Sequence, residues 1–287
     1  MTFCYMFRAM DRGGIGIVSD RRISVRHGFD GWEPETDDAL KFGLLTPHLG
    51  LAFAGQVSLV AKIIEGFSQV DFDRRPSGRM DVVRSSLAEI YKRVVEDSSD
   101  FLSADSNAQF IFFDTYRRHS QQRYRLLRVS MFFHQGEKRL HIAFSQSSNM
   151  QWAAIGASAE IRKSLADLAS TAMSEFANRQ ATVRKRNVDE LAKIEARRSG
   201  PSLSEYVLDT TRGEPVCRVL ETHKIKREFG QSAPDYTQVL GMVASNKIQA
   251  GIEALHSQGD EIAATIGANL HVASYHPAYG LQVLELN

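Results

Sequence analysis

The sequence predicts an α+β fold in which antiparallel strands dominate, on three observations. Short apolar runs bounded by turn residues recur near both ends and in the middle of the chain. Segments with apolar residues at helical spacing stand in blocks between these runs rather than after every strand. The chain has 287 residues, of which 43% are hydrophobic and 24% charged, so it can bury a sizeable core. We expect one domain over residues 1–287.

The first 55 residues predict two hairpins. The runs FCYMFRA and GIGIVSD flank the turn residues DRGG, and the runs LKFGLL and GLAFAG flank TPH. Residues 23–39 between them are polar and aromatic, which indicates a loop or a loose strand pair. Thr2, Asp20 and Lys41 each lie at the end of an apolar run or just inside it. Two hairpins would therefore bring these three side chains within reach of one another.

Two helices and a strand meander are expected next. Apolar residues recur at helical spacing over residues 57–70 and again from Val83 to Val94, and RRPSG separates the two segments. Residues 96–106 are acidic and rich in serine, which is typical of a loop. Three strand-like runs separated by polar turns then follow, at residues 108–116, 123–134 and 139–145.

The second half of the chain is expected to add a strand, a helix, an insertion and a closing group of elements. The short run QWAAIG leads into a helix that Ala157 and Ser158 would cap, with Leu165 and Leu168 on its buried stripe. Residues 179–235 do not continue this pattern and are interpreted as an insertion. The last expected elements are a helix at 235–257 and strands at 266–275 and 280–286.

Thr2, Asp20 and Lys41 together provide the groups that an N-terminal nucleophile hydrolase needs. A threonine hydroxyl is a weak nucleophile until a base takes its proton, and removal of Met1 would free the α-amine of Thr2 for that role. An unperturbed α-amine titrates at about 7.7–8.0, so it can accept and return a proton near neutral pH. The ammonium of Lys41 would favour the neutral amine, and Asp20 would hold Lys41 in place.

These residues and their neighbours resemble the proteasome β-subunit family and its bacterial relatives. The shared features are Thr2, SDRR at 19–22, DDALKF at 37–42 and GLAFAG at 50–55. The resemblance covers residues 2–178 and 236–287. It implies a four-layer αββα sandwich, in which two antiparallel sheets pack face to face between helices. It also implies that Thr2 is the nucleophile and that Asp20 and Lys41 are its charge partners.

The resemblance implies roles for further residues. Arg22 would be a structural partner of the site, and the backbone N–H of Gly55 would bind the oxyanion. The passage AIGASAE resembles a family turn that carries a serine near the nucleophile. Here Ala157 aligns with that serine and Ser158 follows one residue later, which makes Ser158 the candidate hydroxyl. The walls of the pocket for the side chain before the cut bond would be Ile23, Ala39, Gly43, Phe53 and Val57.

Three functions are compatible with these residues. The first is a threonine-type endopeptidase that works inside a homo-oligomeric ring on peptides or unfolded proteins, with an ATPase unfoldase as a candidate partner. The second is an inactive proteasome-like scaffold or binding subunit, which the Ala157 and Ala263 positions favour because the family has Ser and Asp there. The third is an amidase of the same class that acts on small amides.

Composition argues against several other classes. The formal net charge is +1, so no overall field favours a nucleic acid or an anionic membrane as partner. Cys4 and Cys217 are the two cysteines, without CxxC spacing, and no metal motif occurs, so neither a disulfide framework nor a metal or cofactor is expected. No apolar run reaches the roughly 20 residues of a membrane span, and the N-terminus lacks the signal-peptide pattern. We therefore expect a cytoplasmic protein.

Overall fold

The structure is a computed structural model of the chain and divides into two compact units. The first unit contains Met1–Ala172 with Tyr236–Asn287, and the second contains Met173–Asp235. The second unit thus begins before the expected insertion at 179. The described residues are 2–9, 14–26, 32–36, 38–72, 78–96, 107–118, 121–134, 139–146, 150–195, 205–207, 218–220, 236–259, 263–277 and 280–284.

Sheet I has five antiparallel strands in the order β10-β1-β2-β13-β14. The strands are β1 Phe3–Arg8, β2 Ile15–Asp20, β10 Trp152–Gly156, β13 Leu270–His276 and β14 Gly280–Leu284. The first hairpin, β1 with β2, is the one that the sequence predicted. Side chains of β1 and β2 are buried on both faces, which explains why these strands read as continuous apolar runs rather than alternating ones.

Sheet II also has five antiparallel strands, in the sequential order β5-β6-β7-β8-β9. The strands are β5 Phe42–Thr46, β6 Leu49–Gly55, β7 Asn107–Arg118, β8 Gln121–His134 and β9 Arg139–Ser145. The second predicted hairpin, β5 with β6, and the predicted meander are both confirmed. The segment between the hairpins contains a separate strand pair, β3 Ile23–Arg26 with β4 Trp32–Thr36.

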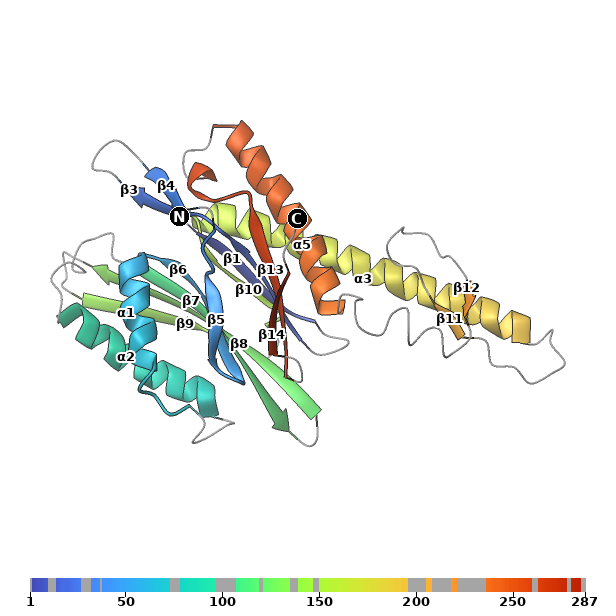
Figure 1. The fold of residues 1–287 in the computed structure, drawn as a ribbon, viewed down its shortest axis with the longest axis horizontal. Helices are drawn as coiled ribbons and strands as arrows, with labels where there is room; N and C mark the ends of the chain where they lie inside the picture. Colours follow the sequence, from blue (N-terminus) through green and yellow to red (C-terminus); the bar gives the residue numbers. More distant parts are fainter. Residues whose placement is uncertain are drawn as a thin grey trace. The chain divides into compact units, whose positions relative to one another are not determined.

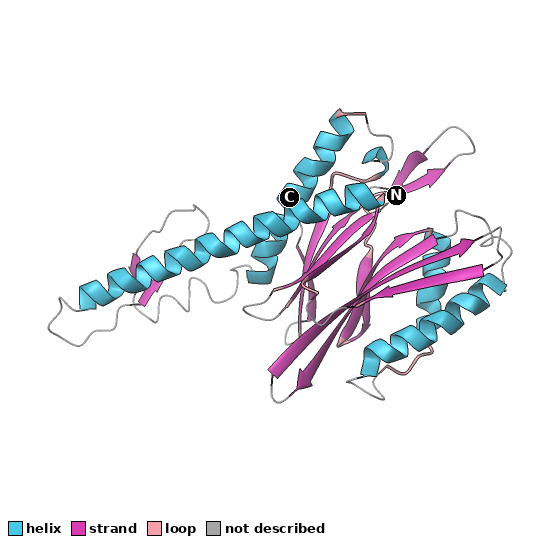
Figure 2. Cartoon of the chain, turned by 180° about the vertical axis from the view of Figure 1, so that it is seen from behind, coloured by secondary structure: helices cyan, strands magenta, loops and turns pink. Residues whose placement is uncertain are grey.

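Helices cover the outer faces of both sheets, so the first unit is the four-layer αββα sandwich that the resemblance implied (Figure 1). The helices α1 Val57–Phe67 and α2 Arg79–Glu96 lie on sheet II. The helix α5 Tyr236–Ser257 and the first turns of α3 Ala159–Glu195 lie on sheet I, as Figure 2 shows from behind. A short 3₁₀ turn, η3 Ala263–Thr265, precedes β13.

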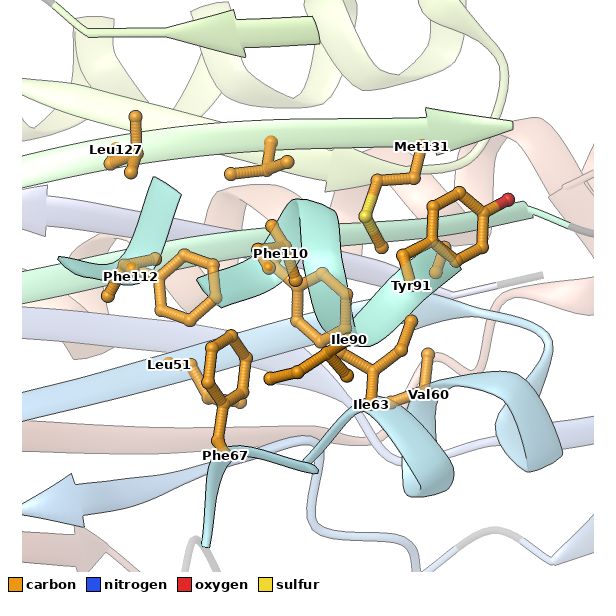
Figure 3. Packing of buried hydrophobic residues seen from close by; sticks show 14 of the residues in the cluster. Leu51, Val60, Ile63, Phe67, Ile90, Tyr91, Phe110, Phe112, Leu127 and Met131 are labelled. Carbon is orange, nitrogen blue, oxygen red and sulfur yellow. The ribbon is translucent and has the colours of Figure 1, made fainter. Parts of the chain in front are cut away.

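Two apolar layers lie on either side of sheet II. The outer one lies between sheet II and the pair α1 and α2, where Ile63 and Phe67 from α1 and Ile90 from α2 meet Phe110 and Phe112 from β7 (Figure 3). The inner one lies between the two sheets, where the opposite face of sheet II packs against side chains of sheet I. Its members include Met6, Ile17, Ile111, Leu126 and Tyr275. Successive residues of β8 thus alternate between the two layers, which fixes its register.

The α3 helix departs from the sequence prediction in two ways. It runs to Glu195 without a break, so part of the expected insertion is helical continuation of the same element. Leu165 is buried as expected, but 43% of Leu168 is exposed, because helical spacing alone does not show how wide the covered face is. The second unit also contains a two-stranded pair, β11 Glu205–Val207 with β12 Arg218–Leu220. Cys217 lies outside the described residues.

Candidate active site

The ammonium of Lys41 lies between the Thr2 hydroxyl and the Asp20 carboxylate. Lys41 Nζ donates to Thr2 Oγ1 at 3.0 Å and to Asp20 Oδ2 at 2.9 Å, and it also donates to the carbonyl of Arg22. The side chains of Lys41 and Asp20 are 3% and 0% exposed. Lys41 immediately precedes β5, and Asp20 ends β2, so the two hairpins do bring the three predicted groups together.

Asp20 is held by two backbone donors in addition to Lys41. The N–H of Phe3 donates to Oδ1 at 2.6 Å, and the N–H of Gly267 donates to Oδ2 at 3.4 Å. Burial raises the pKa of Asp20, while the charge of Lys41 and the Phe3 N–H act in the opposite direction. The position of the carboxylate is therefore fixed by groups from β1, from the residue before β5 and from the turn before β13.

The backbone of Thr2 is fixed by β10 and the turn that follows it. The N–H of Ala157 donates to the Thr2 carbonyl at 2.8 Å. Gly156 has a φ of 79°, and a Cβ added there would lie 1.6 Å from that same carbonyl oxygen. Ala157 has a φ of 50°, which an L-residue with a side chain rarely adopts. Close backbone contact thus fixes the position of the Thr2 main chain.

Gly55 ends β6 with a φ of 116°, a conformation open in practice to glycine alone. A Cβ there would also lie 2.4 Å from the carbonyl oxygen of Asn107 on β7. The residue therefore has to be glycine for reasons of backbone geometry. Its role as oxyanion donor stays a prediction.

Arg22 and Ser158 both lie in the surroundings of the three central groups. The carbonyl of Arg22 accepts from Lys41 Nζ, and its side chain donates from Nη1 to the carbonyl of Ala264 at 2.9 Å. Ser158 Oγ accepts from the N–H of Ile161 at 3.2 Å, so Ser158 caps α3 as the sequence predicted. That bond engages the oxygen, and a catalytic role of the Ser158 hydroxyl stays a prediction.

Three of the residues expected to wall the pocket lie close to Lys41 along the chain or across β5 and β6, namely Ala39, Gly43 and Phe53. The N–H of Phe53 donates to the Lys41 carbonyl at 3.0 Å, and the N–H of Ala39 donates to the Arg21 carbonyl at 2.8 Å. A Cβ added at Gly43 would meet no atom within 4 Å, so the space next to β5 is open there. Val57 starts α1 and is 47% exposed, and Ile23 starts β3 and is half-buried. All of these residues are apolar or lack a side chain.

Sequence reasoning missed three residues that shape the site. Gly267 supplies a backbone donor to Asp20, Gly156 permits the approach of Thr2, and Cys4 lies buried with its Sγ 3.2 Å from Ser19 Oγ. Burial and the charge of Asp20 raise the pKa of Cys4 to about 12. The glycines at 156 and 267 were visible as turn signals, but a turn signal does not reveal which distant backbone will lie against it.

The described part of the chain contains no cluster of His, Cys, Asp and Glu that could hold a metal ion. Within the same residues, no helix is long and apolar enough to cross a membrane.

Comparisons with known proteins gave similarity to solved structures alone. No protein-family model and no curated protein matches the chain. A Gly-1 mutant of Anbu from Hyphomicrobium sp. strain MC1 is 12% identical over 99% of this chain and 86% of that chain, with a TM-score of 0.45. Anbu, the ancestral beta-subunit, from Yersinia bercovieri is 14% identical over 98% and 82%, with a TM-score of 0.45. Eukaryotic HslV from Trypanosoma brucei is 15% identical over 61% and 78%, with a TM-score of 0.35. At such values the chemistry of the site has to be inferred from its own contacts.

Proposed function

We propose that the chain is a threonine-type hydrolase that cleaves peptide bonds with Thr2 as nucleophile. The observation that carries this proposal is the shared ammonium, with Lys41 Nζ 3.0 Å from Thr2 Oγ1 and 2.9 Å from Asp20 Oδ2. A buried ion pair is seldom the most stabilising choice, since apolar side chains of similar volume often serve as well. Its contact with a threonine hydroxyl is better explained by chemistry that needs a positive charge at that oxygen.

In this reaction the proposed groups act in sequence. After removal of Met1, the α-amine of Thr2 takes the hydroxyl proton, and Oγ1 bonds to the carbonyl carbon of the substrate. The Gly55 N–H binds the oxyanion, and Lys41 stabilises the negative charge that develops near Thr2. The C–N bond then breaks as the α-amine passes its proton to the leaving amine. Water hydrolyses the remaining ester by the reverse use of the same base and restores Thr2.

The surroundings of Lys41 favour an apolar side chain before the cut bond. Ala39, Phe53 and Val57 offer no charge, so a charged side chain there would lose its hydration without gaining a partner. An apolar side chain would gain roughly 25 cal/mol for each Å² that it buries. In a fluorogenic peptide panel, we expect cleavage after medium-sized apolar residues and poor cleavage after Asp, Glu, Lys and Arg. A clear preference for charged residues would contradict this assignment of the pocket.

An inactive scaffold is the second candidate, and two observations favour it. Ala157 occupies the position where the resembled family has a serine, and the Ser158 hydroxyl oxygen already caps α3.

An amidase that acts on small amides would use the same three central groups and differs from the peptidase only in substrate size. Turnover separates the scaffold from both enzymes, and a comparison of short amides with longer peptides separates the two enzymes.

The decisive experiment is covalent labelling of the processed protein. Intact mass should show the loss of Met1, and a peptide boronate or epoxyketone should then label Thr2. Thr2→Ala should remain unlabelled, whereas Thr2→Ser should keep part of the activity because both the hydroxyl and the α-amine remain. Labelling that persists in Thr2→Ala would rule out Thr2 as nucleophile. A chain that retains Met1 in its native host would favour the scaffold.

A peptidase of low specificity also needs to be kept apart from other proteins. We therefore infer a homo-oligomeric ring with Thr2 facing an inner chamber, supplied with peptides or unfolded proteins, with an ATPase unfoldase as candidate partner. Light scattering of the processed protein should give several times the 32.1 kDa of one chain. A monomer would contradict the ring but not the chemistry of Thr2.

A further inference from the structure

Two arginines lie near the end of β10 that touches Thr2, and neither has a carboxylate partner among the described residues. Arg162 is in the first turn of α3, and its Nη1 donates to the carbonyl of Gly156 at 3.2 Å. Gly156 is the residue whose backbone lies against the Thr2 carbonyl. Arg128 is on β8, and both arginines are half-buried. A guanidinium in such a place usually has an anionic partner.

Arg128 faces the space between the sheets rather than the outer helical layer. Leu127 and Val129 belong to the core with α1 and α2, whereas Leu126 belongs to the core between the sheets. Because side chains alternate along a strand, Arg128 shares the face of Leu126. The strand β10 packs over β7 and β8. Arg128 therefore lies on the face of β8 that points toward β10 and Thr2.

A polar strip connects Gly156 with Arg128 along this inner face. Gln109 on β7 accepts the N–H of Gly156 at its Oε1 at 3.1 Å. Ser130 is paired with Gln109 across β7 and β8, and it lies two residues from Arg128 on the same face. Apolar side chains fill most of the space between the sheets, so a polar strip beside the site marks a place where a polar ligand group can be received.

Three effects oppose the positive charge of Arg162 in the absence of a ligand. Burial lowers the pKa of Arg162, and the nearby charge of Arg128 lowers it further. The first turn of a helix is also the positive end of its dipole, where a cation is unfavourable. An anion between the two guanidinium groups would relieve all three effects at once, and a planar carboxylate matches the fork of an arginine.

We propose that Arg128 and Arg162 bind a carboxylate of the substrate on the leaving side of the cut bond. The proposal rests on the proposed function. The pocket candidates Ala39 and Phe53 adjoin Lys41, which approaches Thr2 from the Asp20 side, whereas β10 flanks β1 on the opposite side. The acyl part of the substrate therefore lies toward Lys41 and the leaving amine toward Gly156. A substrate with a free terminal carboxylate shortly after the cut bond is then preferred.

Binding of product-like dipeptides tests this without relying on turnover. Calorimetry with the Thr2→Ala chain compares alanyl-alanine, which has a free carboxylate, with alanyl-alanine amide, which has none. Because hydrogen bonds to charged groups are among the stronger ones, we expect the free carboxylate to bind about ten- to a hundredfold more tightly. This ratio should fall to about one in Arg128→Gln and in Arg162→Gln, and should be unchanged in Arg93→Gln, a matched charge loss on the exposed face of α2.

Several outcomes would overturn the proposal. Equal binding of the two dipeptides, or no binding of the free carboxylate, excludes the site, and so does a ratio that survives in both arginine variants. Arg128→Lys and Arg162→Lys keep the charge but lose the planar fork, so they should retain part of the ratio, and their melting temperatures report whether the fold is intact. Hydrolysis measured with the Thr2 chain is a separate readout. Carboxylate binding without hydrolysis would refute the hydrolase, and hydrolysis without carboxylate preference would refute the arginine site.

Discussion

Replacement of Lys41 by methionine is the perturbation whose outcome the structure defines most closely. Lys41→Met keeps the length of the side chain but removes the charge that faces Asp20, which is 0% exposed. Breaking a buried pair by removing one partner costs about 3–5 kcal/mol of folding free energy. We expect a loss near the lower end, about 3 kcal/mol at neutral pH, because the N–H groups of Phe3 and Gly267 still donate to the carboxylate.

The loss of stability in Lys41→Met should depend on pH. Burial already raises the pKa of Asp20, and Lys41 is the first of the groups that lower it, so its removal raises this pKa further. The folded variant then holds the Asp20 proton to higher pH than the unfolded chain does. Stability is therefore lost as pH rises from the ordinary Asp pKa of about 3.9 toward the raised folded value, and the deficit is greatest above it.

Urea unfolding followed by tryptophan fluorescence, at pH values from about 5 to about 8, measures both the loss of stability and its dependence on pH. Lys247→Met, on the exposed face of α5, is the matched control and should stay within about 0.5 kcal/mol of the parent. The double variant Lys41→Met with Asp20→Asn should recover part of the loss, because no charge is left buried. A loss below about 1 kcal/mol that does not change with pH would refute the buried-pair reasoning. Turnover should be abolished in Lys41→Met.

Three further predictions follow from other contacts in the fold. Gly156→Ala should abolish activity and lower the melting temperature, because the new Cβ would lie 1.6 Å from the Thr2 carbonyl oxygen; a variant with parental turnover would contradict this placement of β10. In a Cys217→Ser background, iodoacetamide at pH 8 should leave Cys4 unmodified until urea unfolds the chain. A pKa of about 12 leaves roughly one Cys4 thiol in ten thousand ionised at that pH. Rapid alkylation of the native protein would show that Cys4 is accessible. Tyr275→Phe removes a 2.6 Å hydrogen bond from β13 to a carbonyl of the β5–β6 turn. We expect urea unfolding to show a loss of about 1 kcal/mol of stability. An unchanged midpoint would mean that this link between the sheets does not stabilise the fold.

The sequence by itself determined the elements and the central groups of the site. Apolar runs bounded by turn residues predicted both hairpins, and the hairpins predicted that Thr2, Asp20 and Lys41 would meet. Each hairpin could be predicted because it depends on residues close together in the chain, where periodicity and turn chemistry act. The contact of Lys41 with Thr2 and Asp20 joins hairpins of different sheets, so it also needed the two sheets to pack face to face. The four-layer arrangement was not contained in the pattern and came from the family resemblance.

Only the tertiary structure decided which distant segments complete the site. Gly156 lies against Thr2 because β10 pairs with β1, and Gly267 reaches Asp20 because β13 pairs with β2. No local signal specifies such pairings, since they depend on how the whole set of apolar faces can be buried together. The same holds for Arg128 and Arg162, whose elements are far apart in sequence. The sequence shows that both residues are arginines, but they come close together only when β8 and the start of α3 pack on either side of β10.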